Sequence, residues 1–132
     1  MKYLLDTNLC INFLRGRTFL KARFMTVPRS QKYLCPVVQA ELYFGAYNSA
    51  YPQAGLEILQ QFLVGFPVLP FDQAAAKEYG EIRARLTRQG NLIGPYDLQM
   101  AAIALARGAV VVTHNTEEFG RVAGLEVEDW EA

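Results

Sequence analysis

The chain has 132 residues, of which 52% are hydrophobic and 20% charged, and its acidic and basic side chains are equal in number. This composition excludes a disordered chain and predicts one globular domain spanning residues 1–132. Its apolar runs are shorter than the ~20 residues that cross a bilayer, and its N-terminal apolar segment is too short for a signal peptide. Cys10 and Cys35 fit no metal or redox spacing, which favours free thiols in a cytoplasmic protein with no membrane partner.

Short apolar runs alternate with amphipathic segments, a pattern typical of strands separated by helices. The expected strands are residues 2–6, 33–36, 68–69, 109–113 and 125–127. The expected helices, most of them ending near glycine or proline, are residues 7–14, 19–27, 37–48, 52–65, 74–89 and 95–107. This alternation predicts an α/β fold with a parallel sheet covered by helices on both faces.

Three acidic residues stand beside apolar runs. Asp6 closes the first expected strand, Glu41 lies within the helical stretch VVQAELYFGAY, and Asp97 opens the helical run PYDLQMAAIALA. Glu41 shares the apolar stripe of its helix with Val38 and Leu42, whereas a solvated glutamate would be expected on the polar face. Carboxylates are rarely buried unless they are paired or hold a metal ion. Three that converge would therefore require a cation.

Two of these acids also have a purely structural interpretation. Asp6 is well placed to cap the helix that follows it, although Thr7 or Asn8 would serve as well. Asp97 falls in the first turn of its helix, where a carboxylate complements the helix dipole. Against this, ligands of open parallel sheets bind beyond the carboxyl ends of the strands. Asp6 and the segment 113–115 both lie at such ends, so both point to one crevice.

The ligand types favour metal-dependent phosphoester chemistry. Carboxylate oxygens suit Mg²⁺, with Mn²⁺ as a substitute, and a phosphate and water complete the coordination shell. The only histidine, His114, excludes a histidine-rich zinc site. The sequence lacks GxSxG, GxGxxG and Walker-type motifs, which argues against serine hydrolases and nucleotide cofactors.

The charge is unevenly distributed along the chain. Residues 1–32 carry seven basic side chains against Asp6 alone, whereas the remainder carries six basic and twelve acidic ones. A basic segment beside an acidic site is a plausible footprint for a polyanion, and a solvated helical face is the equally good alternative.

Four sequence blocks resemble the PIN-domain ribonucleases, and more narrowly the VapC-type toxins of type II toxin–antitoxin pairs. They are LLDTN at 4–8, AELYFGA at 40–46, IGPYDLQMAAIALARG at 93–108 and VTHNTEEF at 112–119, and the tail GLEVEDW at 124–130 fits the same family. The resemblance implies a three-layer α/β/α domain with a central, mostly parallel sheet of four to five strands. It also implies Mg²⁺-dependent endonucleolytic cleavage of RNA, often tRNA or rRNA in related toxins. The implied partners are a small VapB-type antitoxin and a second copy of the chain in a homodimer.

By this resemblance, Asp6, Glu41 and Asp97 correspond to the metal-binding acids of the family. Asn115 stands where many relatives carry aspartate, and Glu118 is the nearest acid that would compensate, so both are candidate catalytic residues. The candidate substrate-binding residues are the threonines next to the acids and the basic side chains of the first quarter. They are Thr7, Thr113, Arg15, Arg17, Lys21 and Arg23, with Arg83, Arg85 and Arg88 as an outlying group.

The resulting hypothesis is that Asp6 and Asp97 ligate Mg²⁺, that Glu41 completes the shell and that Asn115 orients a water or a carboxylate. A metal-activated water would then attack the RNA phosphate in line, leaving a 5′-phosphate and a 3′-hydroxyl. One alternative is a catalytically weak PIN fold that acts as an RNA-binding or antitoxin-binding subunit. Another is a metal-dependent phosphatase, for which the segment 6–8 lacks the expected DxD pattern.

Overall fold

A computed structural model describes residues 1–131, the side chains of residues 18 and 19 excepted. Within these residues, four parallel strands form one sheet in the order β2-β1-β3-β4. The strands are β1 (Tyr3–Leu5), β2 (Lys32–Tyr33), β3 (Val110–Val112) and β4 (Val127–Glu128). In the register of the two central strands, Leu5 pairs with Val112. The predicted parallel sheet is therefore confirmed, with four strands.

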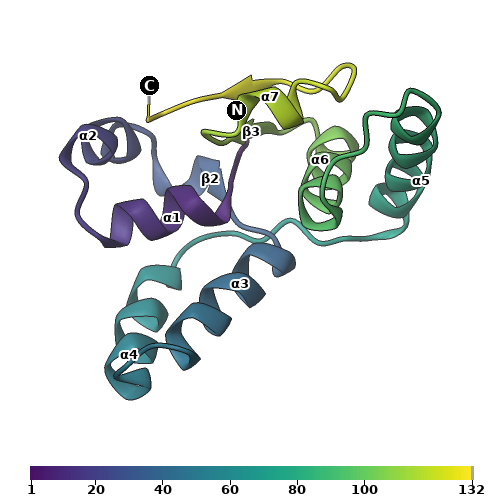
Figure 1. Cartoon of the computed structure of the whole chain (residues 1–132). Coiled ribbons are helices and arrows are strands. Elements are labelled where there is room, and N and C mark those ends of the chain that lie inside the picture. The colour runs from purple at the N-terminus through teal and green to yellow at the C-terminus, as the bar shows by residue number, and fades with distance from the viewer. Residues whose placement is uncertain (132) are drawn as a thin grey trace.

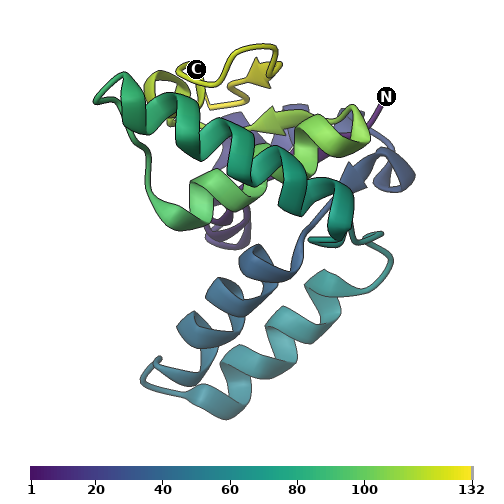
Figure 2. The same cartoon turned by 90° about the vertical axis from the view of Figure 1, so that its right-hand side faces the viewer.

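Helices cover both faces of this sheet. They are α1 (Thr7–Leu14), α2 (Thr18–Thr26), α3 (Pro36–Tyr47), α4 (Pro52–Leu63), α5 (Gln73–Arg88), α6 (Pro95–Arg107) and α7 (Thr116–Phe119), with a 3-10 turn, η1, at Arg29–Gln31. The first two helices lie on one side of the strands and α5 and α6 on the other (Figures 1 and 2). This is the three-layer α/β/α arrangement that the family resemblance implied.

The expected strands and helices need four corrections. The strand expected at residues 68–69 is a single bridge between Val68 and Leu34, because the flanking prolines, Pro67 and Pro70, lack the amide hydrogens of a ladder. The strand expected at 33–36 ends at Tyr33, since Pro36 already begins α3. The last strand lies at Val127–Glu128 instead of 125–127, and the short helix α7 was not expected.

The core lies between the sheet and its helices. The residues of β3 are all buried, as are Leu4 and Leu5 in β1, which explains why these strands have continuous apolar sequences. The C-terminal Trp130 is only 5% exposed and packs edge-on against Phe24 of α2, with ring centroids 6.4 Å apart. The tail is thus part of the core, and it returns the chain to the sheet edge where β1 and β3 end.

Helices α3 and α4 form a hairpin that projects from the body of the molecule (Figure 2). Tyr43 in this hairpin is half-buried and Phe62 is buried, whereas Phe44 and Tyr47 are 67% and 63% exposed.

Both cysteines are free and buried, as expected. Among residues 1–131, no helix combines the length and apolarity that spanning a membrane requires.

Candidate active site

Asp6 is held from two directions. It immediately follows β1 and caps α1, where its Oδ1 accepts a hydrogen bond of 2.8 Å from the Leu9 amide. Its Oδ2 accepts a hydrogen bond of 2.5 Å from the Thr113 hydroxyl, which follows β3. The cap is therefore Asp6 itself and not Thr7 or Asn8. Asp6 can cap the helix and also lie at the predicted crevice, because the same carboxylate does both.

Thr113, a predicted substrate contact, is buried. It is 0% exposed, and its hydroxyl donates to Asp6 while accepting a 3.0 Å hydrogen bond from the Asn115 amide. The hydroxyl is therefore buried and engaged with its neighbours, and in this structure no part of Thr113 is exposed for contact with a substrate. The Asn115 side chain in turn donates to Glu118, so these two candidates form a pair in the turn after β3.

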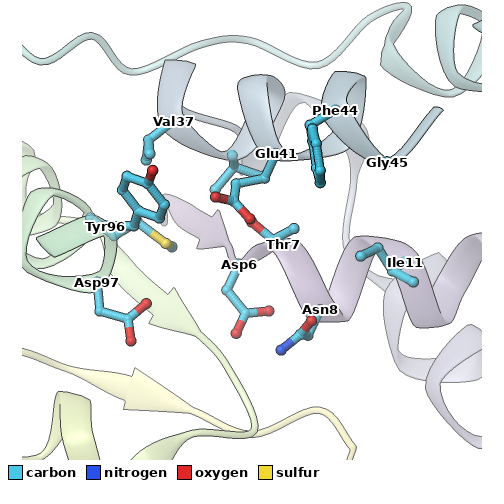
Figure 3. A pocket seen from close by; sticks show the side chains of 12 residues that line it. Asp6, Thr7, Asn8, Ile11, Val37, Glu41, Phe44, Gly45, Tyr96 and Asp97 are labelled. Carbon is cyan, nitrogen blue, oxygen red and sulfur yellow. The ribbon is translucent and has the colours of Figure 1, made fainter. Parts of the chain in front are cut away.

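The three predicted acids converge on one cavity of about 360 Å³. Asp6 comes from the end of β1, Glu41 from the middle of α3 and Asp97 from the first turn of α6. Figure 3 shows the three carboxyl groups facing the same space, with Thr7 and Asn8 beside Asp6. Residues more than 90 positions apart in the chain thus meet where the parallel strands end, as predicted.

The carboxyl groups crowd one another. Burial raises the pKa of Asp97 to about 7, and the adjacent Glu118 carboxylate adds to this rise, followed by the charges of Asp6 and Glu41. Glu118 is therefore close enough to act on Asp97 as well as on Asn115. Glu118, the acid expected to compensate for Asn115 where many relatives carry aspartate, thus lies beside the predicted site.

Two further acids from the C-terminal tail lie near the site and were not predicted. Burial raises the pKa of Asp6, hydrogen bonds from Thr113 and the Leu9 amide offset part of this rise, and the charges of Glu131 and Asp129 add to it. The signal was present in the sequence, since the acid-rich segment EVEDWE (126–131) begins at the last expected strand. Parallel strands end at one edge, so the residues that follow β4 emerge at the same edge of the sheet as Asp6.

His114 belongs to this tail cluster. Its Nδ1 lies 2.9 Å from Asp129 Oδ2, and the ligand-type atoms of His114, Asp129 and Glu131 all lie within 4.8 Å of one another. Glu131 also accepts a hydrogen bond from the Asn12 amide group. The cluster ties the turn after β3 to the end of the chain and adds negative charge next to Asp6.

The basic first quarter is only partly available to a polyanion. The buried Lys32 ammonium donates a 2.7 Å hydrogen bond to the Phe24 carbonyl of α2. Arg23, a predicted substrate contact, forms a 3.2 Å ion pair with Glu128. Its guanidinium also lies 5.4 Å from the Trp130 ring centroid. These two cations hold α2 and the tail in place.

Three predicted basic contacts remain exposed, and none of the ion pairs found among the described residues involves them. They are Arg15, Arg17 and Lys21. Arg15 lines a second cavity of about 420 Å³, between α1 and the α3–α4 hairpin. Ile11 and Glu41 line both this cavity and the acidic one, so the cavity that Arg15 lines adjoins the acidic site.

The donor set fits a hard divalent cation. Asp6, Glu41 and Asp97 offer carboxylate oxygens and no nitrogen or sulfur ligand, which is the preference of Mg²⁺ and Mn²⁺. Burial is the main cause of the raised pKa of Asp97, and the negative charges of Glu118, Asp6 and Glu41 add to it, because like charges repel one another. A cation would relieve this repulsion.

Comparison with known proteins identifies the family. The chain matches the PIN domain over residues 3–125. A "tRNA(fMet)-specific endonuclease VapC" from Shigella flexneri is 38% identical to it over 130 residues, which cover 98% of each protein. The chain belongs to the VapC family of PIN-domain proteins. "Ribonuclease VapC2" of Haemophilus influenzae is another family member, 34% identical over 130 residues and covering 98% of each chain.

The fold of this VapC-family chain also matches solved structures. The crystal structure of DNA-bound VapBC from Salmonella typhimurium contains a chain with a TM-score of 0.91 and 38% identity, and the match covers 98% of both chains. The family and the fold implied by the four sequence blocks are therefore confirmed. PIN-domain nucleases generally depend on divalent metal ions, and the acidic cavity of this PIN domain offers ligands of the required kind.

Proposed function

We propose that this VapC-family protein is a Mg²⁺-dependent endoribonuclease, that tRNA is its substrate class, and that a VapB-type antitoxin neutralises it. The observation that carries this proposal is the convergence of Asp6, Glu41 and Asp97 in one cavity. The substrate class is supported by the Shigella flexneri relative, which is named a tRNA(fMet)-specific endonuclease, and the antitoxin by the VapBC complex from Salmonella typhimurium.

Asp6 and Asp97 would hold the cation, and Glu41 would complete its surroundings from α3. When bound, the cation supplies Lewis-acid polarisation of the phosphate and lowers the pKa of water. The protein's own contribution is orientation: Thr113 and the Leu9 amide fix both oxygens of Asp6.

Proton balance at the site involves Asp97. Because its pKa lies at about 7 in the metal-free chain, part of the Asp97 population carries a proton near neutral pH. Ligand carboxylates must be ionised, so metal binding releases this proton. Glu118, which neighbours Asp97, and its hydrogen-bond partner Asn115 are proposed to orient water or the phosphate. The exposed cations Arg15, Arg17 and Lys21 are proposed to contact the RNA backbone.

The decisive experiment is digestion of total cellular RNA by the purified protein with Mg²⁺ or with EDTA, alongside Asp97→Asn. We expect discrete fragments that require both the metal and Asp97, and end-mapping of these fragments identifies the RNA. Tight RNA binding without cleavage would instead favour the binding-subunit alternative. Asn115 is compatible with that alternative, because it replaces an aspartate that many relatives carry. The homodimer expected from the family stays a prediction, which light scattering on the purified protein would test.

A further inference from the structure

We propose that Phe44 and Tyr96 form a base-stacking subsite beside the three acids, which holds an unpaired nucleobase next to the scissile phosphate. This inference rests on the proposed ribonuclease function and extends it. The acids explain how a phosphate would be bound, but they do not explain what would bind the nucleosides on either side of it. The two rings supply a surface on which a base can stack.

Phe44 lies on the same face of α3 as the acid Glu41. Val37, Glu41 and Phe44 are spaced i, i+4 and i+7, so all three project from one side of the helix. Tyr96 immediately precedes Asp97 in the first turn of α6. In Figure 3, Glu41 lies between the two rings, with Tyr96 on one side and Phe44 on the other. The aromatic pair therefore brackets the acidic site.

Both rings line the acidic cavity and a third cavity, of about 430 Å³, that adjoins it. Ala40 and Val37 complete the apolar lining of this adjoining cavity, and Glu41 is shared by both. Small-ligand sites occupy about 300–1,000 Å³ and combine apolar walls with a few polar groups. The adjoining cavity has this character, and Glu41 is the acid on its wall.

The rings are available for contact. Phe44 is 67% and Tyr96 56% exposed, and neither takes part in the aromatic pairs found among the described residues. Other aromatics of the chain, such as Phe24 and Phe62, are packed in the core. Large exposed rings at the mouth of a cavity offer apolar faces that a planar ligand would cover.

A nucleobase is the occupant that this surface favours. Every unpaired base presents a π-face that stacks on phenylalanine or tyrosine, whereas bases inside a duplex are already stacked. The neighbouring carboxylates at Asp6 and Asp97 suit a cation and a phosphate, and in RNA each phosphate is joined to a nucleoside on either side. The subsite therefore predicts cleavage in unpaired segments of a folded RNA.

The experiment measures stacking directly, in an Asp97→Asn background that prevents cleavage. The probe is a single-stranded nine-nucleotide RNA of random sequence with one central 2-aminopurine, whose fluorescence is quenched by stacking. We expect quenching on binding, and we expect Phe44→Ala and Tyr96→Ala each to reduce the quenching and weaken binding about 5- to 100-fold. Tyr47→Ala is the matched control, since Tyr47 lies on the same helix at 63% exposure and should leave both values unchanged.

Conservative variants separate stacking from a general structural role. Phe44→Tyr and Tyr96→Phe keep the ring and should restore quenching and affinity. In the Asp97-containing enzyme, the alanine variants should raise KM for RNA more than they lower kcat, with unchanged melting temperatures because both rings are exposed.

Two results would overturn the subsite. One is quenching and affinity in Phe44→Ala and Tyr96→Ala equal to those of Tyr47→Ala. The other is unchanged RNA binding together with lost binding of the purified cognate antitoxin, which would assign the rings to a protein interface. Failure of the proposed function looks different, because the wild-type protein would then not cleave RNA with Mg²⁺ whatever the rings do.

Discussion

The hydroxyl of Thr113 donates a 2.5 Å hydrogen bond to Asp6 Oδ2, and it thereby joins the ends of two neighbouring parallel strands. The other Asp6 oxygen is held by the Leu9 amide in the first turn of α1. The carboxylate is thus fixed by the sheet on one side and by a helix on the other. Thr113 is buried, so we expect any effect it has on RNA cleavage to pass through its two hydrogen-bond partners, Asp6 and the Asn115 amide.

Replacing Thr113 by valine tests this link. The change keeps the shape of the side chain but removes both hydrogen bonds of the hydroxyl, so Asp6 loses one of its two anchors and the Asn115 amide loses its acceptor. We expect kcat to fall by about 10- to 100-fold, as for other residues that orient metal ligands. Thr113→Ser keeps the hydroxyl and should retain most of the activity. Equal losses in the serine and valine variants would show that packing, and not the hydrogen bond, is what matters.

The crowded carboxylates predict a pH-dependent stability of the metal-free protein. Because the pKa of folded Asp97 is raised to about 7, the folded chain keeps a proton that the unfolded chain releases near pH 4. The stability that comes from this proton is fully present below about pH 4 and is lost as the pH rises through about 7. The raised pKa of Asp6 acts in the same direction.

We therefore expect the melting temperature in EDTA to fall between about pH 5 and pH 8. Asp97→Asn should flatten this dependence and should melt above the wild-type protein at the upper end. Mg²⁺ should stabilise the wild-type protein at pH 8 more than the variant, because binding to the folded state raises stability. A melting temperature in EDTA that rises over this range would contradict the assignment of Asp97.

The sequence was informative wherever a residue broke its local pattern. Glu41 interrupts an apolar helical stripe, and the structure places it half-buried beside Val38 and Leu42. The buried strand that ends before Thr113 was equally clear, because a fully covered strand is apolar at every position. Patterns of this kind, at the carboxyl ends of parallel strands, were enough to predict the crevice.

What the sequence did not reveal depends on contacts between distant segments. Arg23 resembles any exposed cation of an amphipathic helix until the tail brings Glu128 and Trp130 against it. The contact between His114 and Asp129 was equally hidden, because it joins the turn after β3 to the C-terminal tail. Such pairings are fixed by tertiary packing, which no local propensity encodes.

Glu118 provides the third prediction. Its carboxylate raises the pKa of Asp97, so Glu118→Gln should lower that pKa and weaken the attraction of the site for a cation. At pH 8, where Asp97 is ionised in either protein, we expect the Mg²⁺ concentration for half-maximal cleavage to rise about tenfold. Glu117→Gln is the matched control, since Glu117 is 89% exposed and faces Arg121. If both variants behaved like the wild-type protein, Glu118 would have no part in metal binding.

The exposed cations provide the fourth prediction, which concerns the salt dependence of RNA binding. Each phosphate contact with single-stranded RNA contributes about 0.7 to the slope of log K against log salt concentration. Replacing Arg15, Arg17 and Lys21 together by alanine should reduce the slope by about 2 if each contacts one phosphate. Arg23→Ala should leave the slope unchanged and lower the melting temperature, because Arg23 is engaged with Glu128 and Trp130.

A second triple variant controls for net charge in this experiment. It removes the same number of cations from α5, at Arg83, Arg85 and Arg88, on the opposite side of the sheet from α1 and α2 (Figure 1). If the cations near α1 and α2 contact the RNA, only their removal changes the slope, since distant exposed charges are screened at physiological salt. Equal changes in the two triple variants would mean that RNA senses the overall charge. A smaller slope in the α5 variant alone would indicate that the RNA binds on the other face of the sheet.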